Sequence, residues 1–133
     1  MSMPAITNLT KSRINNKLLT RIIKKAIDVA DIKNISDISI VLVDEKKIKQ
    51  VNRKYRGKNK STDVLSFGDL NEIFICPKIV KKQAKKLDVP FKNELARVTI
   101  HGMLHLAGYD HEKGGQEAEK MRKAEEKILT RIL

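Results

Sequence analysis

Three histidines within eleven residues, in the run HGMLHLAGYDH, have the types and spacing best suited to chemistry. They are His101, His105 and His111, and the chain has no other histidine. His101 and His105 are four residues apart, so on a helix they project from one face, about one turn apart. Gly108 lets the chain leave that helix in a left-handed conformation, which can bring His111 back as a third ligand. Three imidazole nitrogens around one metal leave the fourth tetrahedral position open to water, as in catalytic sites.

The same spacing matches the extended zincin pattern HExxHxxGxxH, with Gly108 as its glycine. The glutamate of that pattern is the general base for peptide cleavage, and here its position is occupied by Gly102. A metallopeptidase would therefore need a carboxylate from elsewhere, such as Glu72. We expect instead that Gly102 leaves room beside the metal for a bulky substrate.

Two carboxylates near the histidines have simpler interpretations. Asp110 could orient a ligating imidazole or cap the turn after Gly108, and the residues alone do not choose between these roles. Glu94 precedes His101 on the same expected helix, where a first-turn acid favours the helix dipole.

A second group of polar residues lies in the segment NRKYRGKNKSTDVLSF, residues 52–67. Arg56 follows an expected helix and precedes the turn at Gly57, which places it to face a cleft. Thr62, Asp63 and Ser66 stand at the ends of a short apolar strand. Taken alone, these are ordinary features of a loop and its neighbouring strand.

The elements that must position these residues alternate between strands and helices. Apolar periodicity predicts strands over 5–9, 37–43, 63–67 and 72–76. It predicts a helix from Lys11 to Ala30 with Ser12 as N-cap, and a second helix that is capped by Asp44 and ends near Tyr55. Three further helices are predicted over 78–87, with Pro77 at its first position, over 91–107 and over 115–133. The helix over 91–107 is apolar around most of its circumference, which indicates a central, buried helix. The third and fourth strands are close in sequence and should pair antiparallel.

These elements predict an α/β (α+β) fold in which helices pack on a mixed, mostly parallel four-stranded sheet. The length of 133 residues fits a single domain over 1–133, with a zincin-like helix carrying the metal ligands. No apolar run is long enough to span a membrane, and no signal peptide is evident. The one cysteine, Cys76, cannot form an internal disulfide, so we expect a cytoplasmic protein.

The charge of the chain points to a polyanionic partner. Lys and Arg total 28 and Asp and Glu total 16, for a formal net charge of +12 and a pI near 9.9. Such a balance in a small domain is most often found in proteins that bind nucleic acid. The alternative is a lysine-rich composition that reflects only codon bias. Aromatic residues make up 4% and Trp is absent, so base stacking is not expected to dominate binding.

Together, the two segments make the chain resemble the YbeY family of bacterial endoribonucleases and ribosomal-RNA maturation factors. The resemblance covers nearly the whole chain and depends on Asn52, Tyr55, Arg56, the run Thr62–Phe67, the run His101–His111, Met121, and Glu125 or Glu126. It implies one zinc ion per chain held by His101, His105 and His111, a functional arginine at Arg56, and no small organic cofactor. It also implies a positively charged cleft that leads to the metal.

The resemblance further implies cleavage of single-stranded RNA in maturation of the small-subunit ribosomal RNA 3′ end and in ribosome quality control. The expected partners are this RNA and the small ribosomal subunit. The metal would either activate a bound water or polarise a phosphoryl oxygen for attack by a ribose 2′-hydroxyl. Arg56 would hold phosphate, and the lysines and arginines around it would steer RNA.

The alternative is a non-catalytic, RNA-binding ribosome assembly factor in which the metal is structural. Four protein ligands would favour this alternative, whereas an open fourth position would favour the enzyme.

Overall fold

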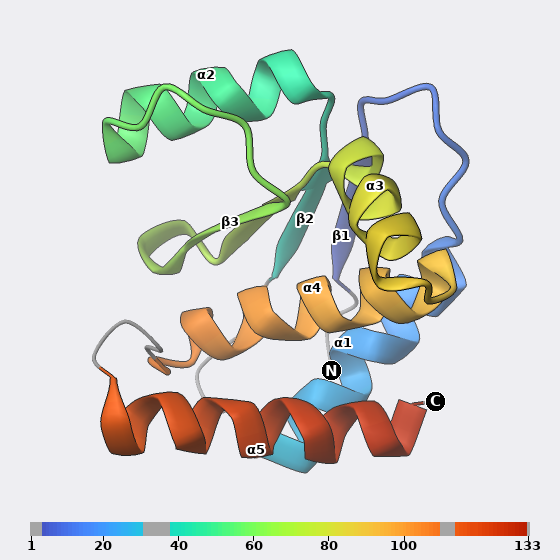
Figure 1. Cartoon of the computed structure of the whole chain (residues 1–133), viewed down its shortest axis with the longest axis vertical. Coiled ribbons are helices and arrows are strands. Elements are labelled where there is room, and N and C mark those ends of the chain that lie inside the picture. Colours follow the sequence, from blue (N-terminus) through green and yellow to red (C-terminus); the bar gives the residue numbers. More distant parts are fainter. Residues whose placement is uncertain (1–3, 31–37, 110–113, 133) are drawn as a thin grey trace.

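A four-stranded mixed sheet forms the centre of the computed structural model, which describes residues 4–30, 38–109 and 114–132 (Figure 1). Its strands have the order β1-β2-β4-β3. They span Ala5–Asn8 (β1), Ser39–Leu42 (β2), Val64–Phe67 (β3) and Glu72–Ile75 (β4). The pairs β1–β2 and β2–β4 are parallel, and β3 pairs antiparallel with β4. The predicted mixed, mostly parallel sheet is therefore confirmed.

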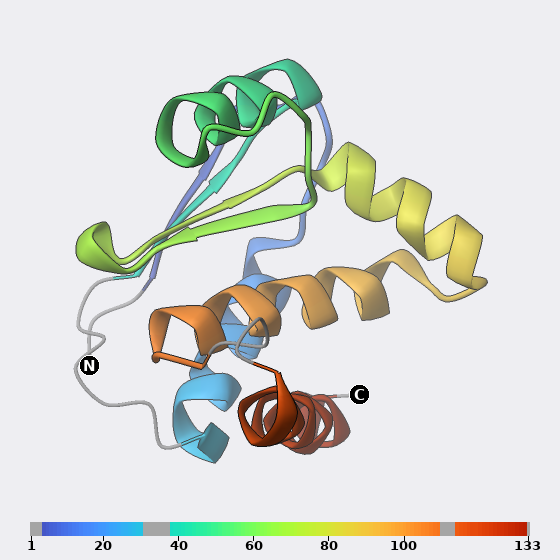
Figure 2. The same cartoon turned by 60° about the vertical axis from the view of Figure 1, so that its left-hand side comes forward.

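Helices cover both faces of this sheet (Figures 1 and 2). On one side lie α1 (Asn16–Ala30), α4 (Phe91–Leu106) and α5 (Gly115–Ile132), and α2 (Glu45–Arg56) lies on the other. Helix α3 (Pro77–Leu87) follows β4 directly and packs against α4. A single 3-10 turn over Gly68–Leu70 joins β3 to β4. None of the described helices is long and apolar enough to cross a lipid bilayer.

Alternation along the strands divides the apolar residues between two cores. Ile40 and Leu42 of β2 are fully buried in the larger core, toward α1 and α4. Val41 and Val43 belong to the smaller core under α2. Because successive side chains of a strand point to opposite faces, this division follows from the sequence pattern. It also directs Ser66 and Val64 of β3 toward α4, where the histidines lie.

Helix α4 is the central helix that its composition predicts. It buries residues on most of its turns, including Leu95, Ile100 and Leu104 against the sheet and the neighbouring helices. The chain leaves it at Gly108, whose φ of 98° is in the left-handed region that favours glycine. The expected exit at Gly108 is confirmed, whereas Asp110 and His111 lie outside the described residues.

The predicted start of the first helix is wrong. Ser12 is not its N-cap; instead Asn15 Oδ1 accepts a hydrogen bond of 3.1 Å from the Leu18 amide. Residues 8–12 form local side-chain turns, in which Asn8 Oδ1 accepts from both the amide and the hydroxyl of Thr10. Short polar side chains compete with helix formation in this way, and they delay the helix by several residues.

The end caps of the next helices follow the sequence more closely. Asp44 caps α2 by accepting a hydrogen bond of 2.8 Å from the Lys47 amide. Gly57 ends α2 in a left-handed conformation with φ of 68°. Pro77 occupies the first position of α3, where its missing N–H costs nothing. The turn at Gly57 is the one that presents Arg56 and the loop after it.

Candidate active site

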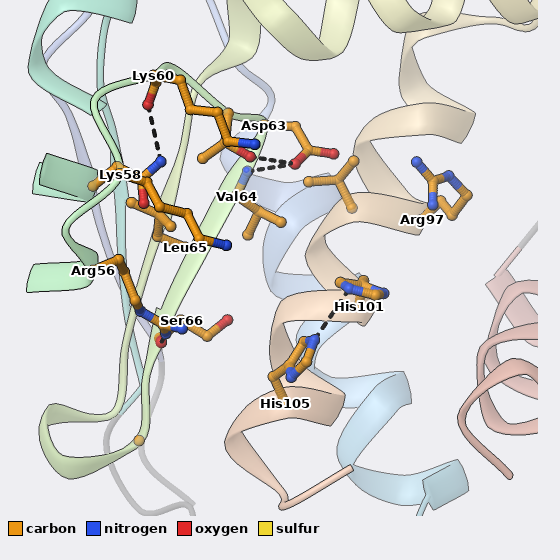
Figure 3. A pocket seen from close by; sticks show the side chains of 14 residues that line it. Arg56, Lys58, Lys60, Asp63, Val64, Leu65, Ser66, Arg97, His101 and His105 are labelled. Atoms are coloured by element: carbon orange, nitrogen blue, oxygen red, sulfur yellow. Dashed lines mark hydrogen bonds between the residues drawn. The ribbon is translucent and has the colours of Figure 1, made fainter. Parts of the chain in front are cut away.

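Two of the three predicted metal ligands meet on one face of α4. The Nε2 atoms of His101 and His105 are 3.2 Å apart, and the two rings are 4.7 Å apart between centroids. Four-residue spacing on a helix stacks side chains one turn apart, which is the reason for this convergence. Both imidazoles are partly exposed at the wall of a pocket (Figure 3).

A carboxylate from the last helix holds the first of these rings. Glu125 Oε1 of α5 lies 2.6 Å from His101 Nδ1. Because a carboxylate can only accept, this contact keeps the proton on Nδ1 and leaves the lone pair of Nε2 facing His105. Met121 and Ile128 anchor α5 by burying their side chains in the larger core. The family resemblance singled out position 125 or 126, and the structure brings Glu125 to the imidazole.

The donor pair fits a zinc ion. Ligand nitrogens at 2.0–2.1 Å from a tetrahedral zinc are about 3.3 Å from each other, close to the observed 3.2 Å. A carboxylate on the distal ring nitrogen is the usual support for a metal-bound histidine. Within the described ranges, no third His, Cys, Asp or Glu completes a metal-binding cluster. The predicted third ligand, His111, is outside those ranges, so its role stays a prediction.

Gly102 has a different role from the one expected of it. A Cβ at this position would lie 3.1 Å from Ile73 Cγ2, 3.1 Å from Ser66 Oγ and 3.2 Å from Val64 Cγ2. The residue faces the sheet, and strands β3 and β4 fill the space that we expected a substrate to use. That expectation is wrong, because glycine serves here to let α4 approach the sheet closely.

Arg56 lies on the wall of the pocket opposite the histidines (Figure 3). Its Nη2 donates a hydrogen bond of 2.6 Å to the backbone oxygen of Ser66. The guanidinium carbon is also 5.4 Å from the centroid of the Phe67 ring, within the range of a cation–π contact. The Ser66 hydroxyl in turn donates to the Gly102 carbonyl at 3.0 Å. Ser66 therefore connects the arginine wall to the histidine helix.

The pocket between these walls has a volume of about 530 Å³ and a basic margin. Its lining includes Arg56, Lys58, Lys60, His101 and His105. The loop that carries the two lysines is held by Asn52, whose buried amide donates to the Lys60 carbonyl at 2.9 Å. A positively charged cleft is what the family resemblance implies, and that it leads to a bound metal stays a prediction. Arg53 and Lys54 are exposed on α2 and do not appear among the described lining residues.

The sequence interpretation missed an ion pair beside His101. Glu94 is only 2% exposed and accepts from Arg97 through two hydrogen bonds, of 2.8 Å from Nε and 2.7 Å from Nη2. When the Gln83 side-chain amide is oriented so that both its oxygen and its nitrogen have suitable partners, the nitrogen donates to Glu94 at 3.0 Å and to Asp63 at 3.2 Å. The hydrogen bonds from Arg97 to Glu94 raise the pKa of the guanidinium, so it stays charged.

Glu94 is therefore more than a first-turn charge. Arg97 lines the same pocket as His101, one turn earlier on α4. The three-residue interval between Glu94 and Arg97 was the available signal for their ion pair.

Glu72, the carboxylate considered for peptide hydrolysis, begins β4 beside Phe67. It is not one of the described residues that line the pocket. A metallopeptidase using Glu72 is therefore not supported by this geometry.

The chain is similar to known proteins over nearly its full length. Residues 5–133 match the family model described as endoribonuclease YbeY. The endoribonuclease YbeY of Thermodesulfovibrio yellowstonii is 50% identical over 105 residues, which cover 71% of this chain and 66% of that protein. The Persephonella marina protein of the same name is 38% identical over 90% of this chain and 84% of its own length.

A solved structure gives the same result for the fold. The solution structure of a Thermotoga maritima protein has 35% sequence identity and a TM-score of 0.66, over 97% of this chain and 91% of that one. The sequence family and the fold therefore agree with each other. The chain belongs to the endoribonuclease YbeY family.

Proposed function

We propose that this protein is a zinc-dependent endoribonuclease that cuts single-stranded RNA. The observation that carries the proposal is the pocket in which a paired imidazole site faces Arg56 and two lysines. The names of its relatives support the same activity. We further propose a cytoplasmic role in maturation of the small-subunit ribosomal RNA 3′ end and in ribosome quality control, as the family resemblance implies.

The histidines would hold the metal, and the rest of the site would hold the histidines. His101 and His105 would supply two nitrogen ligands, with His111 as the predicted third. When bound, zinc would supply Lewis acidity and lower the pKa of a coordinated water toward about 7. Glu125 would keep the His101 ring in the correct tautomer and orientation.

Arg56 would bind the phosphate that is cut. A guanidinium can donate two parallel hydrogen bonds to phosphate oxygens and stabilise charge that develops during cleavage. One edge of Arg56 already donates to the Ser66 carbonyl, which limits the directions in which the side chain can point. The preorganised arginine would hold the phosphate between itself and the two imidazoles.

Lys58 and Lys60 would attract the backbone without reading its sequence. Both are exposed on the loop at the margin of the pocket. Contacts to phosphate position a nucleic acid, and contacts to base edges are needed to specify it. The volume of about 530 Å³ is typical of a small-molecule site. It would accept part of one strand more readily than a duplex.

Cleavage of a labelled single-stranded RNA by purified protein tests this function. His105→Ala, purified identically, is the control, because a basic protein readily carries contaminating nucleases. We expect cleavage by the wild type alone, together with loss of bound zinc and a lower Tm in the variant. A wild type that melts at the same temperature with and without zinc would contradict the metal site. Equal or absent cleavage in both proteins would instead favour the non-catalytic assembly factor.

A further inference from the structure

We propose that the exposed sides of α2 and α3 form a second RNA-binding surface outside the pocket. This inference rests on the proposed function and extends it to the RNA on either side of the cut. The surface, here named the α2–α3 basic surface, comprises the five Lys and Arg side chains of α2 that precede Arg56 and the five lysines of α3. All ten side chains are exposed.

The positive charge of the chain is concentrated on these two helices. Together, α2 and α3 contain eleven Lys and Arg residues and one acid, Glu45. Eleven cations less one acid give a formal charge of +10, against +12 for the whole chain. By contrast, α5 has five cations and four acids, and Arg122 pairs there with Glu119 and Glu126. A codon bias toward lysine would affect all helices alike, so this uneven distribution indicates a functional surface.

The cations of each helix are aligned along one side. Lys78, Lys81, Lys82 and Lys85 recur at three- and four-residue intervals, which place them on one helical face. The two helices meet where Glu45 contacts Lys82 at 3.3 Å and Lys78 at 3.5 Å. Even these two lysines remain 64% and 69% exposed. One carboxylate between them therefore leaves most of the positive charge available to a partner.

The α2–α3 basic surface adjoins the pocket at two points. Helix α2 ends at Arg56, and the following loop carries Lys58 and Lys60 into the pocket lining. From α3, Gln83 contacts Asp63, which also lines the pocket. An RNA strand held in the pocket could therefore continue over either helix. This continuity favours RNA over an acidic protein as the partner.

The surface is suited to the phosphate backbone and not to particular bases. It consists of lysines and arginines, with Tyr55 as the one exposed aromatic side chain on either helix. Each phosphate contact with single-stranded RNA makes the slope of log affinity against log salt concentration steeper by about 0.7. The surface should therefore strengthen binding of long RNA, while an oligonucleotide short enough to occupy only the pocket should gain little.

Two matched triple variants test this proposal. One replaces Lys81, Lys85 and Lys86 of α3 with Gln, and the other replaces Lys17, Lys24 and Lys25 of α1 with Gln. Both remove three exposed positive charges, but α1 lies on the other side of the sheet from α2 (Figure 1). Their affinities would be measured without metal, so that no RNA is cut. The probes are RNAs of about 6 and about 40 nucleotides, a range that spans the usual single-strand site sizes.

We expect the α3 triple variant to bind the long RNA about 100-fold more weakly at about 0.1 M salt, with a slope of log affinity against log salt that is lower by about 2. Its affinity for the short RNA should change less than about twofold, as should both affinities of the α1 variant. Equal losses in the two variants would overturn the proposal, because net charge alone would explain them. Unchanged binding in both would also overturn it and would leave an acidic protein as the partner.

These binding measurements separate the inference from the proposed function. If the wild type binds long RNA more tightly than short RNA but cuts neither, the proposed binding surface stands and the proposed endoribonuclease activity is refuted. If the wild type cuts both RNAs and the α3 triple variant binds both as tightly as the wild type does, the proposed RNA cleavage stands and the proposed second binding surface is refuted.

Discussion

Replacing Gly102 with Ala tests how closely α4 must approach the sheet. The added Cβ would lie 3.1–3.2 Å from atoms of Ile73, Ser66 and Val64. Favourable contacts between carbon atoms are about 3.5–4.0 Å long, so the helix and strands would have to separate by about 0.4 Å or more. Overpacking of this kind costs about 1–3 kcal/mol, while Ala gains about 1 kcal/mol over Gly in a helix. We expect a net destabilisation of about 1 kcal/mol.

The same displacement should impair the site more than the fold. Ser66 connects Arg56 to Gly102 through its backbone oxygen and its hydroxyl, and His101 directly precedes Gly102. Misplacing catalytic groups by about 1 Å can cost 100-fold in rate, so a shift of a few tenths of an ångström should lower RNA cleavage about tenfold. Zinc affinity should change little, because His101 and His105 share one helix. Urea unfolding, zinc titration and single-turnover cleavage measure the three effects.

A glycine elsewhere provides the control. An added Cβ at Gly68 would have no atom within 4 Å, so Gly68→Ala should change the free energy of unfolding by less than about 0.5 kcal/mol. If Gly102→Ala were about 1 kcal/mol more stable than the wild type and cut RNA at the same rate, helix propensity alone would govern this position. That result would refute the argument that the close approach to β3 and β4 sets the geometry of the pocket.

Three further substitutions test the pocket. Arg56→Ala should keep the fold and zinc affinity but lose RNA cleavage, and an unchanged cleavage rate would remove Arg56 from the mechanism. Glu125→Gln should weaken zinc binding about 10- to 100-fold in a competition titration, whereas Glu126→Gln, one residue further on the exposed side of α5, should not. Arg97→Met should lower the free energy of unfolding by about 2 kcal/mol, because it leaves Glu94 buried without its partner. This is less than for a fully buried pair, since the Arg97 side chain is 40% exposed; a change below about 0.5 kcal/mol in urea would contradict the pairing.

Much of the fold could be predicted because the pattern of apolar residues is strong. The run DISIVLV predicts β2, and the alternation within it assigns Ile40 and Leu42 to one core and Val41 to the other. Pro77 and Asp44 mark helix starts through local chemistry that needs no distant contact. Ser12 was misassigned because several polar residues before α1 could each cap it, and hydrogen bonds within residues 8–12 decide which one does.

The candidate site could be predicted to a similar extent. His101 and His105 converge because a helix places residues four apart on one face, which the sequence alone determines. Arg56 could be recognised as a candidate, but its position opposite the imidazoles depends on how α2, β3 and α4 pack. Glu94 and Arg97 were overlooked because an acid in the first turn of a helix is usually an exposed charge. Here Glu94 is buried, contacts Gln83 of α3 and holds Arg97, which lines the pocket.

The sequence by itself therefore determined the elements, the concentration of positive charge and the imidazole pair, since each depends on residues close together in the chain. Only the tertiary structure decided that Glu125 supports His101, a contact between residues 24 apart on two helices. It also decided that Gly102 faces two strands and not a substrate. Contacts of this kind depend on the packing of whole elements, where a displacement of a few tenths of an ångström changes which atoms touch. Local sequence patterns do not carry that information.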